Sequence, residues 1–347
     1  MKKLKNINRV LVIRAGALGD LVYSLSVIEA LQKEYGQSVQ IDFVCSSGLT
    51  SIFDNDKRVG RIFPIKHKKF PILLSSQKKE VIKFSKNRAY DLLINLEGSK
   101  YFHKLALAIN ARYKTGFFFL PPPSKEHTTN AHSQQVHAVV GLKGAYALHV
   151  KSKNLDSSFP KLYGTPKSEV FKKYNLPEKY IVINPSNSHN KKEKINYRAW
   201  AKENWIELIK TIDKSVKLVV IAGRGEEKYF ETMRPYFKNC IDLIAKTSLP
   251  DLIGVIENAE AIITTDTGPA HIASAVNTPT FVLIGPTPAG GTGPFQSPTN
   301  EINVISLNLE CSPCYGSKRM YECKDNVCMS GITPSSVIDI LKTKGHI

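Results

Sequence analysis

The segment TTDTGPAH, Thr264–His271, places an acid, a glycine–proline pair and a histidine between two apolar runs that predict buried strands. Thr267 and Gly268 would offer backbone N–H groups and a hydroxyl at a helix N-terminus, which is a ready site for phosphate. An acid beside that site argues against phosphate alone. Asp266 fits better in a mixed site, where its carboxylate binds a sugar hydroxyl. His271 either faces this ligand or packs in the core.

A second segment, RAGALGD at residues 14–20, joins two glycines and a carboxylate directly after another apolar run. Gly16 and Gly19 permit a ligand to approach the backbone closely. Asp20 falls in the first turn of the helix that follows. It either contacts a ligand there or only caps the helix. The cap explains the acid but not the paired glycines, whose spacing is not that of the dinucleotide fingerprint.

Strand and helix patterns alternate along the chain in two series, which predicts two parallel sheets wound with helices. The expected strands are 9–14, 39–45, 60–65 and 91–96, then 180–184, 217–222, 261–265 and 280–285. The expected helices are 21–34, 77–88, 100–111, 131–148, 198–212, 226–237, 250–258 and a short one from Pro269.

Between residues 150 and 179 the pattern gives way to Lys, Ser, Pro and Asn, which predicts an interdomain linker. The resulting domains are 1–165 and 166–347. In parallel sheets of this kind, ligands bind beyond the carboxyl ends of the strands. Both loops described above fall at such ends.

Length and composition limit the class of protein. The chain has 347 residues, of which 42% are hydrophobic, enough for two ordinary cores. No apolar run reaches the roughly 18 residues that a membrane span needs, and the N-terminus lacks the apolar region of a signal peptide. These features predict a cytoplasmic protein.

The charge balance is strongly basic, with 48 Lys and Arg against 30 Asp and Glu, a net +18. Such a surface suits nucleic acid, an acidic membrane or a phosphorylated sugar, or it is merely well solvated. The basic clusters are not interleaved with aromatic residues and belong to no nucleic-acid module, so no nucleic-acid partner is expected.

Four stretches together resemble glycosyltransferase family 9, the lipopolysaccharide heptosyltransferases. They are residues 10–31, which contain RAGALGD, residues 90–117, residues 266–295, which open with DTGPAH, and the cysteine-containing residues 311–341. They occur in the family's order over nearly the whole chain, and the DTGPAH block is the most specific. Ser26 departs from the family, which often has proline there, and this puts the start of the first helix in doubt.

The resemblance implies a GT-B fold, in which two Rossmann-like domains face each other across a cleft. The C-terminal domain would hold ADP-heptose, and the N-terminal domain the lipid-borne acceptor. The implied reaction moves heptose to the inner core of lipopolysaccharide, onto lipid A-Kdo or a heptosyl acceptor, with inversion. It implies no cofactor and no metal, and a peripheral position on the inner face of the inner membrane.

Site residues carry over from the family's motifs. Asp20 matches the family's general base, because a carboxylate can accept the proton of the acceptor hydroxyl during attack. Gly16 and Gly19 belong to the acceptor loop. Four residues match the family's donor-binding block, namely Asp266, Thr267, Gly268 and His271. The resemblance places Asp266 near the heptose and the amides of Thr267 and Gly268 near the diphosphate.

A cation should neutralise the charge that develops on the departing ADP. In the family, a lysine after the first strand of the C-terminal domain does so, and Lys194 is the best match. Lys191 and Lys192 compete with it, and the aromatic–proline pair that usually follows the lysine is absent. Ser186 and Ser188 could supply hydroxyl groups to the phosphates.

The loop AGRGEE, residues 222–227, matches the family's loop whose acid contacts the nucleotide ribose. Glu226 is taken for this role, although Glu227 could equally fill it. The alternative is that both acids only stabilise the first turn of a helix.

Cys311, Cys314, Cys323 and Cys328 have the spacing C-x2-C-x8-C-x4-C, which allows a zinc site to be considered. The second pair lacks the tight spacing of a zinc knuckle, and a reducing cytoplasm favours free thiols. The expectation is therefore no bound metal.

Three alternatives to a heptosyltransferase remain. A nicotinamide-dependent oxidoreductase would share the sheets but needs a fingerprint that neither domain's first strand offers. A sugar-nucleotide epimerase of the same fold could use an ADP or UDP sugar. A glycosyltransferase could also use a different nucleotide sugar. Product analysis separates transfer from epimerisation, because only transfer requires an acceptor.

Overall fold

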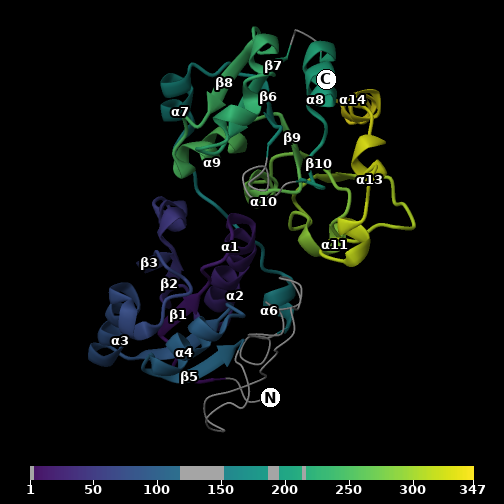
Figure 1. The fold of residues 1–347 in the computed structure, drawn as a ribbon. Coiled ribbons are helices and arrows are strands. Elements are labelled where there is room, and N and C mark those ends of the chain that lie inside the picture. Colours follow the sequence, from purple (N-terminus) through teal and green to yellow (C-terminus); the bar gives the residue numbers. More distant parts are fainter. Residues whose placement is uncertain (1–3, 118–151, 187–194, 213–215) are drawn as a thin grey trace. The chain divides into compact units, whose positions relative to one another are not determined.

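The computed structural model describes residues 4–117, 152–186, 195–212 and 216–347 (Figure 1). The chain forms two compact units, Met1–Leu162 and Tyr163–Ile347. The first unit thus ends close to residue 165, where the sequence analysis placed the domain boundary. Within the described ranges, no helix has the length and apolar character required to cross a membrane.

The first unit contains a five-stranded parallel sheet in the order β3-β2-β1-β4-β5. Its strands are β1 (Arg9–Ile13), β2 (Gln40–Ser46), β3 (Val59–Ile65), β4 (Tyr90–Asn95) and β5 (Ala111–Gly116). Its helices are α1 (Leu18–Ser24), α2 (Ser26–Tyr35), α3 (Ser76–Asn87), α4 (Lys100–Ala108) and α6 (Ser152–Asp156), with 3₁₀ turns η1 (Ser47–Phe53) and η2 (Ile72–Leu74). Side chains of α3 and α4 pack with side chains from all five strands to form one core.

The second unit contains a six-stranded sheet in the order β11-β10-β9-β6-β7-β8, again parallel. Its strands are β6 (Tyr180–Asn184), β7 (Lys217–Ala222), β8 (Cys240–Ile244), β9 (Ala261–Thr265), β10 (Thr280–Leu283) and β11 (Ile302–Ile305). Its helices are α7 (Lys167–Tyr174), α8 (Lys202–Thr211), α9 (Leu249–Glu257), α10 (Gly268–Ala275), α11 (Ala289–Thr292), α12 (Lys318–Tyr321), α13 (Val327–Ser330) and α14 (Pro334–Thr343), with 3₁₀ turns η4 (Glu227–Phe230) and η5 (Arg234–Tyr236). Helices α8 and α14 cover one face of this sheet.

Both sheets have the doubly wound strand order, in which the chain moves outward from the first strand and then returns to its other side. The order reverses between β1 and β4 in the first unit and between β6 and β9 in the second. Ligands of such sheets bind at the carboxyl ends of these central strands. The loops after β1, β4, β6 and β9 are therefore the positions where a site is expected.

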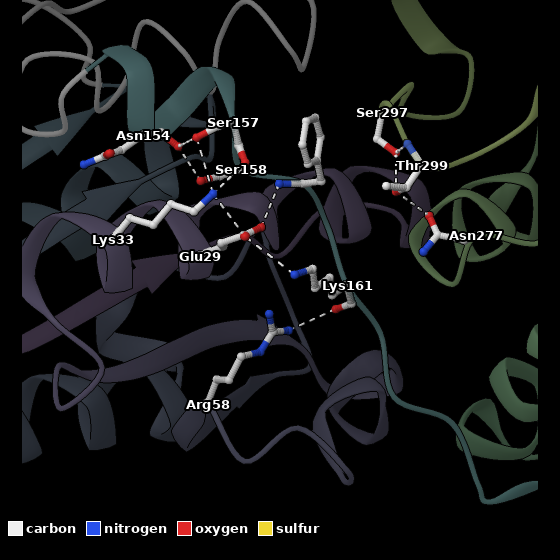
Figure 2. Close-up of polar contacts among 11 residues, drawn as sticks. Glu29, Lys33, Arg58, Asn154, Ser157, Ser158, Lys161, Asn277, Ser297 and Thr299 are labelled. Carbon is white, nitrogen blue, oxygen red and sulfur yellow. Dashed lines mark hydrogen bonds and ion pairs between the residues drawn. The ribbon is translucent and has the colours of Figure 1, made fainter.

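Residues 152–162 lie within the predicted linker, yet they are fastened to the first unit (Figure 2). The Lys33 ammonium donates to the main-chain oxygen of Ser157 at 2.6 Å, and the N–H of Phe159 donates to Glu29 at 3.1 Å. The Arg58 guanidinium donates to the main-chain oxygen of Lys161 at 3.0 Å. Main-chain groups of this part of the predicted linker thus bind side chains of the first unit.

Two predicted helices differ in the structure. The helix expected at 21–34 is two helices, α1 and α2, joined at Leu25. The hydroxyls of Ser24 and Ser26 donate to main-chain oxygens three residues earlier, which competes with regular helical bonding. The helix expected at 226–237 is only the turns η4 and η5, because Pro235 cannot continue a helix. The helix expected at 131–148 lies outside the described residues.

Candidate functional site

Asp20 lies in the first turn of α1, at the carboxyl end of the sheet. The N-cap residue of α1 is Ala17, whose methyl side chain cannot accept a capping hydrogen bond. The alternative in which Asp20 is the N-cap is therefore wrong. Its carboxylate instead pairs with the guanidinium of Arg14 at 2.8 Å and stays 42% exposed. Arg14 also donates to the main-chain oxygen of Leu96, at the end of the adjacent strand β4, at 2.5 Å. The carboxylate is thus oriented from one side and open to solvent on another.

Gly16 has a steric role in this loop. A Cβ built on Gly16 would lie 2.9 Å from Oδ2 of Asp20 and 3.2 Å from Cζ of Arg14. The ion pair therefore occupies the space that any larger residue would fill. Gly19 lies within the first turn of α1.

Glu97 is an acidic residue at this site that the sequence analysis did not identify. It follows β4, the strand beside β1 at the point where the strand order reverses, and it accepts the N–H of Ala15 at 2.6 Å. Burial raises the pKa of Glu97, while the positive charges of Arg14 and Lys68 act to lower it and the Asp20 carboxylate acts to raise it. The available signal was its place in the sequence, directly after a predicted strand.

Asp266 directly follows β9 and is almost fully buried, with its side chain 4% exposed. Its Oδ2 pairs with the guanidinium of Arg198 at 3.1 Å and accepts the hydroxyl of Thr292 at 2.8 Å. Arg198 also donates to the main-chain oxygen of Asp266. The acid thus binds two protein groups that come from distant parts of the second unit.

Arg198 is the cation that the structure brings to the Asp266 loop, and the sequence analysis missed it. Lys194, the residue expected in that role, lies outside the described residues. Two residues further on, Trp200 is buried and donates to the main-chain oxygen of Ile332 at 2.8 Å. The sequence did contain a signal for Arg198, namely the family's pattern of a cation followed by an aromatic–proline pair. Here Arg198 is the cation, Trp200 the aromatic residue, and Ala201 stands in place of the proline.

Thr267 begins α10 as its N-cap residue, and Gly268 is the first residue of the helix. The Thr267 hydroxyl lies 3.1 Å from that of Thr264 and accepts the side-chain amide of Asn184 at 3.1 Å. Asn184 also donates to Thr264 at 3.0 Å and to the main-chain oxygen of Ser186 at 3.1 Å. This amide joins the loops after β6 and β9, and the Thr267 hydroxyl, expected to bind phosphate, takes part in that link.

Ser186 and Glu226 come together at the carboxyl end of the same sheet, after β6 and β7. The Ser186 hydroxyl donates to Oε2 of Glu226 at 2.5 Å, and the N–H of Gly223 donates to the same oxygen at 3.2 Å. Glu226 is buried, whereas Glu227 is exposed, so Glu226 is the acid that belongs to this cluster. Ser188 lies outside the described residues.

His271 lies in the first turn of α10 and is buried. Its burial agrees with the packed alternative that the sequence analysis left open. Contact of His271 with a ligand stays a prediction.

The cysteine-rich segment packs near the end of β10. A Cβ on Gly285 would lie 3.0 Å from Sγ of Cys328, and the N–H of Cys314 donates to the main-chain oxygen of Pro286 at 2.9 Å. Burial and the neighbouring thiols raise the pKa of Cys328 to about 11. In the part of the chain that the structure describes, no three His, Cys, Asp or Glu side chains form a group that could hold a metal ion.

The two loop systems are chemically different. The first presents a solvent-accessible carboxylate with a guanidinium and a second, half-buried carboxyl group beside it. The second presents a helix N-terminus, a buried Arg–Asp pair and a Ser–Glu pair around the ends of β6, β7 and β9. The first is suited to accepting a proton, and the second to binding an anionic group with attached hydroxyls.

Comparison with known proteins agrees with this organisation. Residues 80–324 match glycosyltransferase family 9 (heptosyltransferase). The chain is 23% identical over 322 residues to lipopolysaccharide heptosyltransferase 1 of Escherichia coli O18:K1:H7, covering 86% of this chain and 95% of that protein. It is also 23% identical to lipopolysaccharide heptosyltransferase 1 of Campylobacter coli, covering 96% and 98%.

Solved structures show the same fold. A family 9 glycosyl transferase from Veillonella parvula superposes with a TM-score of 0.80 at 20% identity, covering 99% of this chain and 98% of that one. Escherichia coli ADP-heptose lps heptosyltransferase II superposes with a TM-score of 0.72 at 19% identity, covering 96% and 98%. With the two parallel sheets, these likenesses confirm the GT-B fold class. The chain is a glycosyltransferase, and it belongs to glycosyltransferase family 9.

Proposed function

We propose that this protein transfers heptose from ADP-heptose to the inner core of lipopolysaccharide, on a lipid A-Kdo or heptosyl acceptor, with inversion. The observation that supports this most directly is the pair of loops where the strand order reverses, one with an accessible carboxylate and one with a helix N-terminus. The names of the relatives point to the same reaction.

In the proposed reaction, the oxygen of the acceptor hydroxyl attacks the anomeric carbon of the donor, and the Asp20 carboxylate accepts the proton of that hydroxyl. The new C–O bond forms as the bond from that carbon to the diphosphate breaks, and ADP leaves with the electron pair. Attack opposite the leaving group inverts the anomeric centre. The ion pair with Arg14, at 2.8 Å, supports this role because it fixes the orientation of the carboxylate.

The proposed donor site is the group of loops after β6, β7 and β9. The first N–H groups of α10 and the positive end of its dipole would meet the diphosphate. Glu226 would meet the ribose, with Ser186 beside it. Arg198 is proposed to stabilise the departing ADP, either directly or by shaping the loop through Asp266.

A metal-free reaction is part of the proposal, because guanidinium and N–H groups can stabilise the charge on ADP. Turnover is therefore expected to be unchanged by excess EDTA, followed as ADP release after the chelator is added. Loss of turnover that added divalent metal restores would contradict this. Elemental analysis of the purified protein should give less than one equivalent of zinc or iron, which tests the cysteine segment separately.

Purified protein with ADP-heptose and a series of truncated lipopolysaccharide acceptors provides the test. We expect ADP release that depends on the acceptor, and a product heavier by one heptose in mass spectrometry. Conversion of the nucleotide sugar without acceptor would indicate an epimerase instead. ADP-glucose and UDP-sugars serve as donor controls, since activity with them alone would reject heptose as the donor sugar.

The acceptor is anchored in a membrane in this proposal, so the enzyme would work on the inner face of the inner membrane as a peripheral protein. The net charge of +18 supports contact with anionic lipid. Cell fractionation tests this, with the protein expected on membranes at low salt and released by high salt.

A further inference from the structure

An exposed apolar group lies on the loop that leaves β3. Leu73 and Leu74 are 80% and 71% exposed, and Phe70 is 44% exposed. In the described residues, no other large hydrophobic side chain is as exposed as these two leucines. We call the segment Lys66–Leu74 the β3–α3 loop. Three large apolar side chains open to water within five residues are unusual for a surface that has no partner.

The loop is held in a defined conformation. Lys78 of α3 is fully buried, and its ammonium donates to the main-chain oxygens of Lys68 and Phe70 at 2.8 and 2.7 Å. The N–H of Lys66 donates to the side chain of Gln77 at 3.2 Å. Burying an ammonium requires hydrogen bonds that compensate its lost hydration. The side chain of Lys78 thus fixes a loop whose leucines remain exposed.

Positive charge surrounds the apolar group. From Lys66 to Lys79 the chain carries five lysines and no acid. Of these, Lys66, Lys69 and Lys79 are exposed. Lysine is depleted from the centres of protein–protein interfaces, whereas apolar side chains with lysines around them are typical of contacts with an anionic bilayer.

We propose that the β3–α3 loop is the membrane-docking surface of this protein, with Phe70, Leu73 and Leu74 entering the headgroup region of an anionic phospholipid bilayer. Lysines of the loop then contact lipid phosphates. The inference rests on the proposed function to the extent that a membrane-borne acceptor gives the enzyme a reason to dock.

The loop lies at the carboxyl end of the sheet, as Asp20 does. Strands β1 and β3 are parallel and two places apart, so their carboxyl ends are separated by roughly 10 Å. The charge of Lys68 also acts on the carboxyl group of Glu97, which places this loop beside the Asp20 site. Docking through the loop would hold the proposed acceptor site near the bilayer surface, where the acceptor's sugars project.

Binding to acceptor-free vesicles tests the proposal. The probes are vesicles of phosphatidylethanolamine with one quarter phosphatidylglycerol, and vesicles of phosphatidylcholine alone. The unaltered protein is expected to bind the anionic vesicles and to lose binding as salt rises from about 0.05 to 0.5 M. The double variant Leu73→Ser with Leu74→Ser should bind at least about tenfold more weakly. Lys66→Gln with Lys69→Gln should lose about fivefold per lysine on anionic vesicles only.

The matched control is the double variant Tyr321→Ser with Val327→Ser, which removes two apolar side chains of 68% and 49% exposure from the second unit. It should bind vesicles like the unaltered protein. Unchanged binding by the leucine variant, with an unchanged melting temperature, would overturn the proposal. So would a dimer in sedimentation that the leucine variant dissociates without lipid, because the loop would then be an interface between copies.

A second readout separates this inference from the proposed function. With a soluble, deacylated acceptor, the leucine variant is expected to release ADP at the normal rate, and to be slow only on acceptor embedded in vesicles. No ADP release by any variant, together with normal vesicle binding, would reject heptosyl transfer and leave the docking surface standing.

Discussion

Asp20 and Asp266 each lie beyond the carboxyl end of a central strand, one in each sheet, yet their environments are opposite. Each follows a central strand where the strand order reverses. The Asp20 side chain is 42% exposed and pairs with a residue of its own loop, whereas the Asp266 side chain is 4% exposed and binds Arg198 and Thr292 from other segments. Topology therefore brings an acid to the carboxyl end of each sheet. The surroundings of each acid determine whether it can contact a ligand.

The difference teaches that the position of an acid after a strand does not identify a ligand contact. A general base must reach its substrate, and exposure allows Asp20 to do so. Asp266 has an oxygen already bonded to a guanidinium and a hydroxyl, so its first effect is to shape the loop that begins α10. The sequence analysis predicted a ligand contact for both acids. For Asp266 the structure supplies a second explanation, its bonds to Arg198 and Thr292.

The largest expected effect is that of Asp20→Asn, which keeps the shape of the side chain and removes its basicity. We expect turnover to fall by about a hundredfold or more, with donor affinity nearly unchanged. Stability should change little, because the ion pair with Arg14 is partly solvated. Steady-state rates, ADP titration and a melting curve measure these three quantities. Near-normal turnover with a lower melting temperature would make Asp20 a structural residue.

Asp266→Asn should instead act on stability, because it leaves the buried Arg198 guanidinium without its counter-charge. The expected loss in free energy of unfolding is about 3 kcal/mol, measured in urea. If Asp266 shapes the loop, ADP and ADP-heptose should lose affinity equally in calorimetry. A loss for ADP-heptose alone, of about 1–3 kcal/mol, would restore Asp266 to the sugar.

The control for Asp266 is Asp251→Asn, which removes a second buried acid of the same unit. Asp251 pairs with Lys173 at 2.7 Å and accepts the hydroxyl of Thr165 at 2.7 Å. Burial pushes its pKa upward, but these hydrogen bonds prevail and hold the pKa well below the ordinary value. This variant should lower stability above about pH 4, where the carboxylate is ionised in the unfolded chain as well, and leave ADP affinity unchanged.

Gly16→Ala should have a smaller effect that is confined to the first loop. The new Cβ meets the ends of two flexible side chains, so Asp20 and Arg14 must shift while the backbone need not. We expect turnover to fall by about tenfold, and stability to stay within about 1 kcal/mol. Gly98→Ala is the matched control, because a Cβ there meets nothing within 4 Å. Equal rates in the two variants would mean that the position of the ion pair is not critical.

The sequence predicted the central strands of both sheets, because continuous apolar runs such as those of β1 and β9 are typical of strands buried on both faces. It missed β5, β8 and β11. All three are edge strands, β5 in the first sheet and β8 and β11 in the second. Strand β5 contains a lysine and β8 an aspartate, while β11 contains an asparagine and is only four residues long. Polar edge positions weaken the pattern on which such a prediction depends.

The site residues that the sequence predicted lie in loops with several special residue types together, such as glycine beside an acid. Arg198 has no such neighbours, and Glu97 has only Gly98 beside it. Each joins the site only because the fold returns it to a central strand, Arg198 from the segment before α8 and Glu97 from the end of β4. Contacts between residues far apart in the sequence are set by tertiary structure, and one sequence does not reveal them.

Glu97→Gln is expected to give the smallest effect, and it tests whether the two carboxyl groups of the first loop act together. The raised pKa of Glu97 means that the folded protein binds this proton more tightly than the unfolded chain does. Stability from Glu97 is therefore present below the ordinary Glu pKa and is lost as pH rises through the higher folded value. Glu97→Gln should remove this decline in the free energy of unfolding as pH rises above about 4.

The same variant should shift the acid limb of turnover to lower pH, because a carboxyl group that interacts with the Asp20 charge has been replaced by a neutral amide. The maximum rate should stay within about threefold of normal, since Gln can still accept the N–H of Ala15. An unchanged acid limb together with an unchanged stability profile would show that Glu97 titrates independently of Asp20. Asp20 would then remain as the carboxylate that governs this loop.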